Sequence, residues 1–183
     1  MTAPRALPRM PVMNAPARTA RRLLMLLVLL GMAGQALPQT PGYTVEIVVF
    51  RNGSDAAALD AGAARPGVSG DDVEAVSAAS RRLAGSVARL NGKGLRVLAQ
   101  GAWKQEPTAF RSRRGVSAAR LGQAGITGKV ILERGEKLHL GVDLVIEDGG
   151  KRYRLNEIRQ VKTDEINYFD HPAIGVLAIV TSD

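Results

Sequence analysis

The strongest pattern in this sequence is the alternation of apolar and polar residues between positions 138 and 146. Every even position there is Leu, Val or Ile, whereas the odd positions include His139 and Asp143. A period of two is typical of a β-strand with one buried face. Residues 128–134 alternate as well, and Gly135 with Glu136 suits the turn between the two stretches. The sequence therefore predicts a β-hairpin, and a core built on a sheet.

Four further segments are rich in β-branched, aliphatic or aromatic residues and favour strands: 43–50, 95–104, 151–162 and 174–180. The first is apolar on nearly both faces, which is typical of a central strand. In the second, one face is expected to carry Leu95, Val97, Ala99 and Trp103. We expect a bulge near Asn156 in the third, and a rigid corner at 168–172 before the fourth, with Tyr168 or Phe169 packed inward and Asp170 accepting from loop N–H groups.

One helix is expected ahead of the second strand. Val73, Val76, Leu83, Val87 and Leu90 recur at spacings of three and four, with Ser80 as the interruption. Ser69 or Asp71 suits its start, and Asn91–Gly92 suits its end. Residues 52–70 hold small and polar residues and predict a flexible loop, and 106–125 reads as polar and irregular.

The order of these elements predicts an α+β fold in two layers. We expect a mostly antiparallel sheet of about six strands with one main helix on one face, because a single amphipathic helix cannot form a core alone. Residues 37–183 are long enough for a single domain. The chain contains no cysteine, so packing alone must stabilise that domain.

The N-terminal segment 1–36 reads as a secretory signal peptide. Five arginines precede an aliphatic run at 23–30, and Gly34 and Ala36 suit the positions that a signal peptidase reads. The sequence therefore predicts cleavage near Ala36 and a periplasmic protein that contacts the membrane only through this segment. An uncleaved N-terminal anchor is the alternative.

The positive charge belongs mainly to this leader. The chain has 25 basic and 17 acidic residues, yet no acidic residue precedes Glu46. Residues 37–183 therefore have a small net charge, which gives no indication of nucleic-acid binding.

Three groups of residues could contact a ligand. Trp103, Lys104 and Gln105 could stack on a sugar and bind its amide, or the tryptophan could simply cover the core. Arg111, Arg113 and Arg114, with Arg120 nearby, could bind carboxylates or phosphates, or be solvated. Asp170 and His171 could form an acid–base pair, or fix a corner with Pro172.

The sequence contains none of the common catalytic motifs. G-x-S-x-G, H-E-x-x-H, the P-loop and the dinucleotide-binding glycine pattern are all absent. The two histidines, His139 and His171, are far apart in the sequence, and we expect His139 on the polar face of its strand. We therefore predict no enzyme, no cofactor and no metal site.

Four blocks together resemble the CsiV family of periplasmic peptidoglycan-binding proteins of Gram-negative bacteria. They are YTVEIVVFR at 43–51, LRVLAQGAWKQ at 95–105, GKVIL at 128–132 with LHL at 138–140, and EINYFDHPAIGVL at 165–177. The resemblance implies peptidoglycan binding and a supporting role in cell-wall synthesis at the cell envelope. It implies peptidoglycan as a partner, and a cell-wall synthesis protein or its lipoprotein activator as another. A protein-binding scaffold and, more remotely, a wall hydrolase using Asp170 and His171 are the alternatives.

Overall fold

A computed structural model describes residues 42–53 and 73–183. The predicted signal segment 1–36 and most of the predicted loop at 52–70 lie outside the described residues. Among those that are described, no helix is long and apolar enough to cross a membrane.

The described residues form ten strands in two sheets, with one α-helix. The first sheet has the order β2-β3-β1-β10-β9, and the second has β4-β6-β7-β8 with β5 paired to β6. The strands are β1 (Tyr43–Arg51), β2 (Glu74–Ala75), β3 (Arg96–Gln105), β4 (Thr108–Ala109), β5 (Val116–Ser117), β6 (Ile126–Arg134), β7 (Leu138–Asp148), β8 (Lys151–Val161), β9 (Ile166–Asp170) and β10 (Ile174–Ser182). The helices are α2 (Ala84–Gly92) and the 3-10 turns η2 (Ala78–Ser80) and η3 (Ala118–Leu121). Pairing is antiparallel in both sheets except between β4 and β6.

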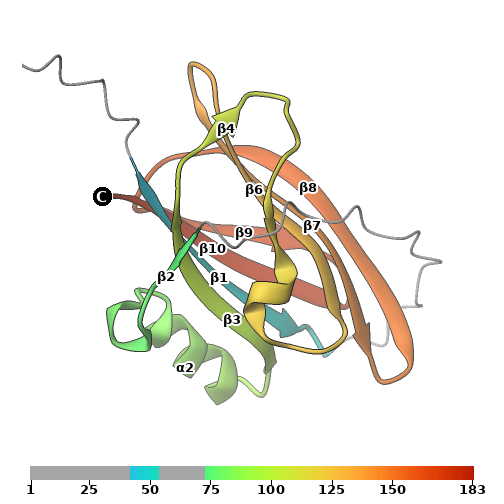
Figure 1. The fold of residues 1–183 in the computed structure, drawn as a ribbon. Coiled ribbons are helices and arrows are strands. Elements are labelled where there is room, and N and C mark those ends of the chain that lie inside the picture. The colour runs from blue at the N-terminus through green and yellow to red at the C-terminus, as the bar shows by residue number, and fades with distance from the viewer. Residues whose placement is uncertain (1–41, 54–72) are drawn as a thin grey trace, which may run out of the picture. The chain divides into compact units, whose positions relative to one another are not determined.

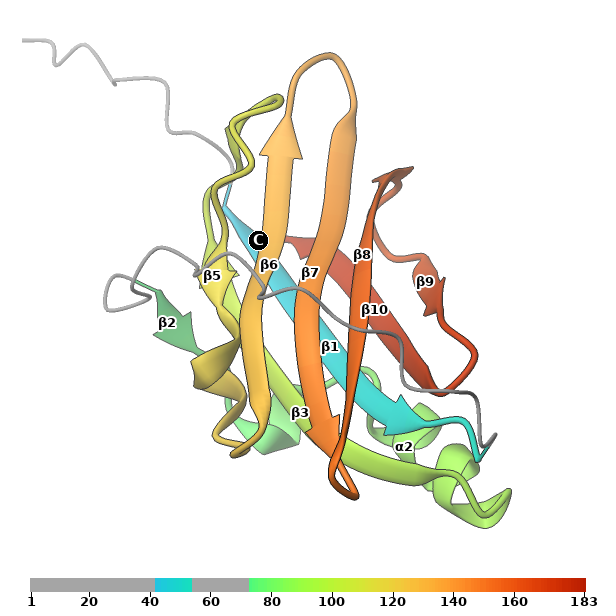
Figure 2. The same cartoon turned by 90° about the vertical axis from the view of Figure 1, so that its right-hand side faces the viewer.

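The two sheets pack face to face over one core, as the two views of the ribbon show (Figures 1 and 2). The long strands contribute alternate residues to it, for example Ile47 from β1 and Val142 from β7, both fully buried. The predicted hairpin of β6 and β7 is confirmed, and the aliphatic even positions of β7 belong to this core. Two antiparallel sheets that share one core through alternate residues form a β-sandwich.

Helix α2 covers the outer face of the first sheet. Leu83, immediately before the helix, is fully buried against Val48 and Ile179, and Val87 and Leu90 pack beside them. The helix begins without a capping side chain of its own. The carboxylate of Glu46 on β1 caps it instead. Its oxygens accept from the N–H groups of Arg82 at 2.7 Å and Leu83 at 3.0 Å. The coarse expectation of a mostly antiparallel fold with one helix is thus confirmed.

The strand count and the helix bounds were wrong in the sequence-based prediction. There are ten strands in two sheets among the described residues, because the stretch predicted as irregular supplies β4 and β5, the expected helix supplies β2 and the expected corner supplies β9. The first half of the expected helix is β2 and η2 instead. There, Val73 packs on the core between the sheets and the Val76 N–H donates to the carbonyl of Ala102, so β3 holds this segment extended.

Strand irregularity also lies elsewhere than expected. The β7–β8 register runs unbroken past Asn156, whereas β1 and β3 shift register between Val49 and Phe50. This shift turns Val97 toward α2 and Leu98 toward the core between the sheets, so Val97 does not share a face with Trp103.

The predicted corner at 168–172 is mostly strand. Residues 166–170 form β9, and the chain turns just after it. Phe169 is fully buried, as expected of an inward-packed ring, while Tyr168 lies on the other face. The carboxylate of Asp170 accepts from the Tyr168 hydroxyl at 2.7 Å rather than from the expected loop N–H groups.

Candidate functional site

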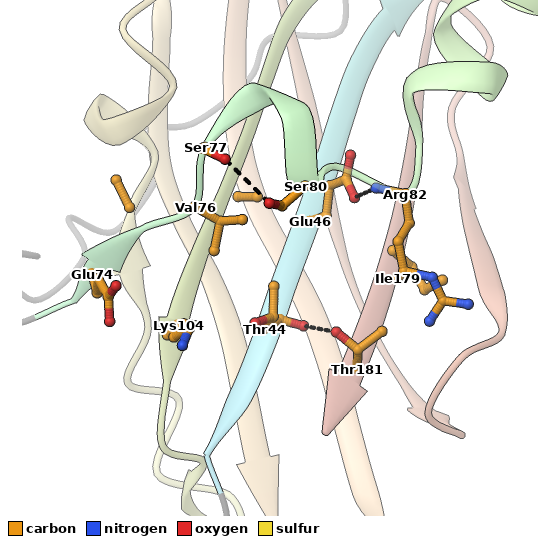
Figure 3. Close-up of a pocket in the computed structure, with 12 residues that line it drawn as sticks. Thr44, Glu46, Glu74, Val76, Ser77, Ser80, Arg82, Lys104, Ile179 and Thr181 are labelled. Carbon is orange, nitrogen blue, oxygen red and sulfur yellow. Dashed lines mark hydrogen bonds between the residues drawn. The ribbon is translucent and has the colours of Figure 1, made fainter. Parts of the chain in front are cut away.

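A cavity of about 430 Å³ lies on the outer face of the first sheet, beside the segment that carries β2 and η2 (Figure 3). The edge segment stands over strands β3, β1 and β10 and forms one wall, and the sheet forms the floor. The lining comprises Thr44, Glu46, Glu74, Ala75, Val76, Ser77, Ser80, Arg82, Ala102, Lys104, Ile179 and Thr181. We call this the first cavity.

Hydroxyl groups make up much of its surface. Thr44 and Thr181 are cross-strand partners on β1 and β10, and the Thr44 hydroxyl donates to the carboxylate of Asp183 at 3.0 Å. On the opposite wall the Ser77 and Ser80 hydroxyls lie 3.2 Å apart. Such groups can both donate and accept, which suits a polar ligand such as a peptide or a sugar.

Opposite charges face each other across the β2–β3 edge. Glu74 is the register partner of Lys104, and both lie in the lining. The Lys104 side chain is 46% exposed, with its ammonium 4.0 Å from the Asp183 carboxylate. An ion pair this long and this exposed holds its partners weakly, so the ammonium stays available to a ligand.

The other two charged residues of the lining serve the fold. Glu46 is buried, and its two oxygens accept from the backbone at the start of α2. The Arg82 guanidinium turns to Asp164 in the loop before β9. Lys104 and Glu74 therefore remain as the charged pair that can engage a ligand.

The three residues 103–105 separate in the structure. Trp103 is 2% exposed and lies in the core, with its indole N–H donating to the Gln105 side chain at 2.6 Å. The ring is thus not presented to a sugar, which agrees with the alternative in which Trp103 covers the core. Lys104 points to the opposite face of β3 and lines the first cavity.

The arginine loop at 111–114 wraps around a buried carboxylate. Glu133 on β6 is fully buried and accepts from the Arg111 N–H at 2.9 Å, from the Arg113 N–H and from the Ser112 hydroxyl. Arg111 and Arg113 have positive φ values of 65° and 56°, so their N–H groups converge on one anion. No sequence pattern indicates this role, because Glu133 occupies an ordinary polar position of an alternating strand.

The arginine side chains of this loop point outward and belong to different surroundings. The Arg111 guanidinium lies over the exposed Phe110 ring, which in turn tilts against His139 at 4.7 Å between centroids. Arg114 is exposed. Arg113 lines a separate cavity of about 350 Å³ on the outer face of the second sheet. We call this the second cavity.

Asp170 and His171 are adjacent in sequence but differ in environment. Asp170 is exposed, whereas His171 is 7% exposed and its Nδ1 accepts from the Ala173 N–H at 3.2 Å. Burial lowers the pKa of His171, and the negative charge of Asp170 partly offsets that effect. His171 packs edge-on against Tyr153, at 6.0 Å between ring centroids.

Neither a metal cluster nor a known relative points to a function. The described residues contain no group of three or more His, Cys, Asp or Glu side chains that could hold a metal ion. Comparison with family models, with curated proteins and with solved structures finds no match to this chain.

Proposed function

We propose that this chain is a periplasmic, peptidoglycan-binding accessory protein that supports cell-wall synthesis without catalysing a reaction. The leader at 1–36 and the resemblance of the strand blocks to the CsiV family suggest the compartment and the ligand. The pairing of Lys104 with Glu74 in the hydroxyl-lined first cavity is the structural observation that carries the proposal.

The chemistry of the first cavity fits the peptide stems of the wall better than its sugars. Stem peptides carry carboxylates, amides and free ammonium groups within a short length. Lys104 can bind a carboxylate and Glu74 an ammonium, while the hydroxyls of the sheet floor can bond amides. Trp103, the residue best suited to stack on a sugar, is in the core.

Co-sedimentation with purified sacculi tests the proposal. The exported protein should pellet with sacculi, and Lys104→Glu should weaken the binding about tenfold or more, because it places two carboxylates opposite each other. Lys151→Glu is the matched control, since Lys151 is an exposed lysine at the β7–β8 turn. The control should bind like the wild type.

The charge pair can be tested further by exchanging its members. The double variant Glu74→Lys with Lys104→Glu restores opposite charges in reversed order and should recover part of the binding. Equal binding by the wild type and Lys104→Glu would contradict the proposal. Release of soluble muropeptides by the wild type, abolished in His171→Ala, would instead favour the hydrolase alternative.

A second candidate function is protein binding at strand β9. This strand is an edge of the first sheet, and its outer face carries Ile166 and Tyr168, which are 51% and 39% exposed. An exposed edge strand can accept an extended segment of another protein. A purified cell-wall synthesis protein or its lipoprotein activator would be the partner. Ile166→Asp should then weaken that complex, while Lys104→Glu should leave it intact.

A further inference from the structure

The second cavity holds an unusual concentration of charge for the face of a sheet. It is lined by Arg113, Lys129, Ile131, Asp143, Arg154, Asn156, Glu157 and Ile158, from β6, β7, β8 and the arginine loop. Lys129 and Asp143 are 8% and 4% exposed as whole residues, so the sheet encloses most of both side chains. A carboxylate as enclosed as that of Asp143 requires a partner.

Each carboxylate around this cavity already has a cation. Asp143 pairs with Arg154 at 3.0 Å, Glu157 pairs with Arg159, and Glu133 beneath the arginine loop lies 3.9 Å from Arg113. These pairs account for every acidic group in the lining and for Glu133 behind it. The one remaining cation is the ammonium of Lys129.

Lys129 lacks a partner among the described residues. Asp143 is its register partner on β7, yet neither carboxylate oxygen of Asp143 comes within 4.0 Å of the ammonium. The ammonium makes no hydrogen bond to any other described residue either. The side chain is largely enclosed, but its nitrogen is not among the buried atoms that lack a partner, so the ammonium opens onto the cavity. A ligand in the cavity can therefore reach it.

A second donor in the same cavity is also unsatisfied. Arg154 bonds Asp143 through one terminal nitrogen, whereas its Nε is buried and has no acceptor. Lys129 and Arg154 come from different strands and line one cavity. Two unsatisfied cationic donors beside one excess positive charge form a site for an anion with more than one oxygen.

We propose that the second cavity binds an oxyanion, a carboxylate or phosphate group of a small molecule, through Lys129 and Arg154. The ammonium supplies the neutralising charge, and the Arg154 Nε–H supplies a directed hydrogen bond. This site lies on the second sheet and is separate from the Lys104 cavity of the first, so it goes beyond the proposed wall binding.

Nuclear magnetic resonance can observe the proposed donor directly. The Nε–H signal of Arg154, assigned by its loss in Arg154→Lys, is followed in the full wild-type protein. Sodium phosphate and sodium acetate are titrated separately, with sodium chloride keeping the ionic strength constant. At least one oxyanion should shift this signal with a saturable dependence, and the one acting at lower concentration identifies the preferred group.

Two results of this titration would overturn the proposal. One is the absence of a saturable shift with both oxyanions. The other is an identical shift with sodium chloride alone, which would show a general salt effect. Lys129→Met should abolish the saturable shift, and its persistence in that variant would also contradict the assignment of the site.

Thermal unfolding provides a second, independent measurement. Without added oxyanion, Lys129→Met should change Tm by less than about 2 °C, because the ammonium opens onto the cavity and has no partner to lose. Phosphate or acetate should raise the Tm of the wild type and not that of Lys129→Met. Lys151→Met, at an exposed position of the second sheet, should behave like the wild type in both respects. A Tm of Lys129→Met lower than that of the wild type by about 4 °C or more would show that Asp143 already satisfies Lys129 and would overturn the proposal.

Discussion

The two cavities lie on the outer faces of the two sheets, and each contains a lysine in a different state. Lys104 in the first cavity is half exposed, opposite Glu74, among hydroxyl groups. Lys129 in the second is 8% exposed, among charges that are already paired with one another. Lys104 lies opposite a carboxylate that can share a ligand with it, whereas Lys129 is the one unpaired cation of the described lining of its cavity. We therefore expect a ligand with both charges in the first cavity and an anion in the second.

The largest loss of stability is expected from a substitution of Leu83, where the wall of the first cavity meets helix α2. Leu83→Ala removes a fully buried side chain between α2 and the first sheet and should lower the free energy of unfolding by about 3 kcal/mol. Chemical denaturation measures this. Leu83→Met keeps the volume and should cost less than about 1.5 kcal/mol. Equal stability of Leu83→Ala and the wild type would show that α2 does not seal this face.

The next largest loss of stability is expected at Glu133, which holds the arginine loop beside the second cavity. Glu133→Gln replaces one acceptor oxygen by a donor beneath the N–H groups of Arg111 and Arg113, and should cost about 2 kcal/mol. Glu136→Gln, at the exposed turn of the β6–β7 hairpin, is the matched control and should cost less than about 0.5 kcal/mol. Indistinguishable denaturation curves for the two variants would refute the structural role of Glu133.

A pH effect should arise outside both cavities, at His171. Because burial lowers the pKa of His171 in the folded protein, the unfolded chain binds a proton more readily. The stabilising contribution is complete above pH 6.5 and should be lost as the pH falls from there through the folded-state pKa. Denaturation midpoints between pH 7.5 and 4.5 check this, with His171→Phe compared against His139→Phe. Only the first substitution should reduce the loss of stability in acid.

The smallest change in stability is expected from a substitution of the exposed Lys104. Lys104→Met should change the free energy of unfolding by less than about 0.5 kcal/mol, because its pair with Asp183 is long and solvated. Measuring the stability of Lys104→Met and of Lys129→Met by thermal or chemical unfolding under the same conditions compares the two lysines directly. A loss of 2 kcal/mol or more in Lys104→Met would mean that the first cavity depends on this residue for its shape.

The sequence predicted those parts of the fold that are built from repeated patterns. The alternation at 138–146 located β7, and the apolar blocks located β1 and β10 close to their observed bounds. It did not predict the second sheet as a separate layer. Short strands such as β2 and β4 owe their conformation to the strand beside them, and a pattern within two residues cannot show that.

The candidate sites were harder to predict. Burial determines whether a polar side chain can meet a ligand or instead stabilises the fold. Lys129, Glu133 and Lys104 all occupy ordinary polar positions of strands in the sequence. In the fold, Glu133 is enclosed by a loop from 20 or so residues earlier, and Lys104 faces a two-residue edge strand. Trp103 could be placed in the core or at a ligand from its residue type alone, and only the packing distinguished the two.

The most direct test of the proposed function uses sacculi whose stem peptides have been removed. An amidase cleaves the stems from the glycan strands, and binding of the protein to intact sacculi and to the stripped glycan strands is measured with each material immobilised at equal sugar content. We expect binding to intact sacculi and at least a tenfold loss on the stripped glycan, since Lys104 and Glu74 would have lost their charged partners. Equal binding to both materials would contradict recognition of the stem peptide by the first cavity.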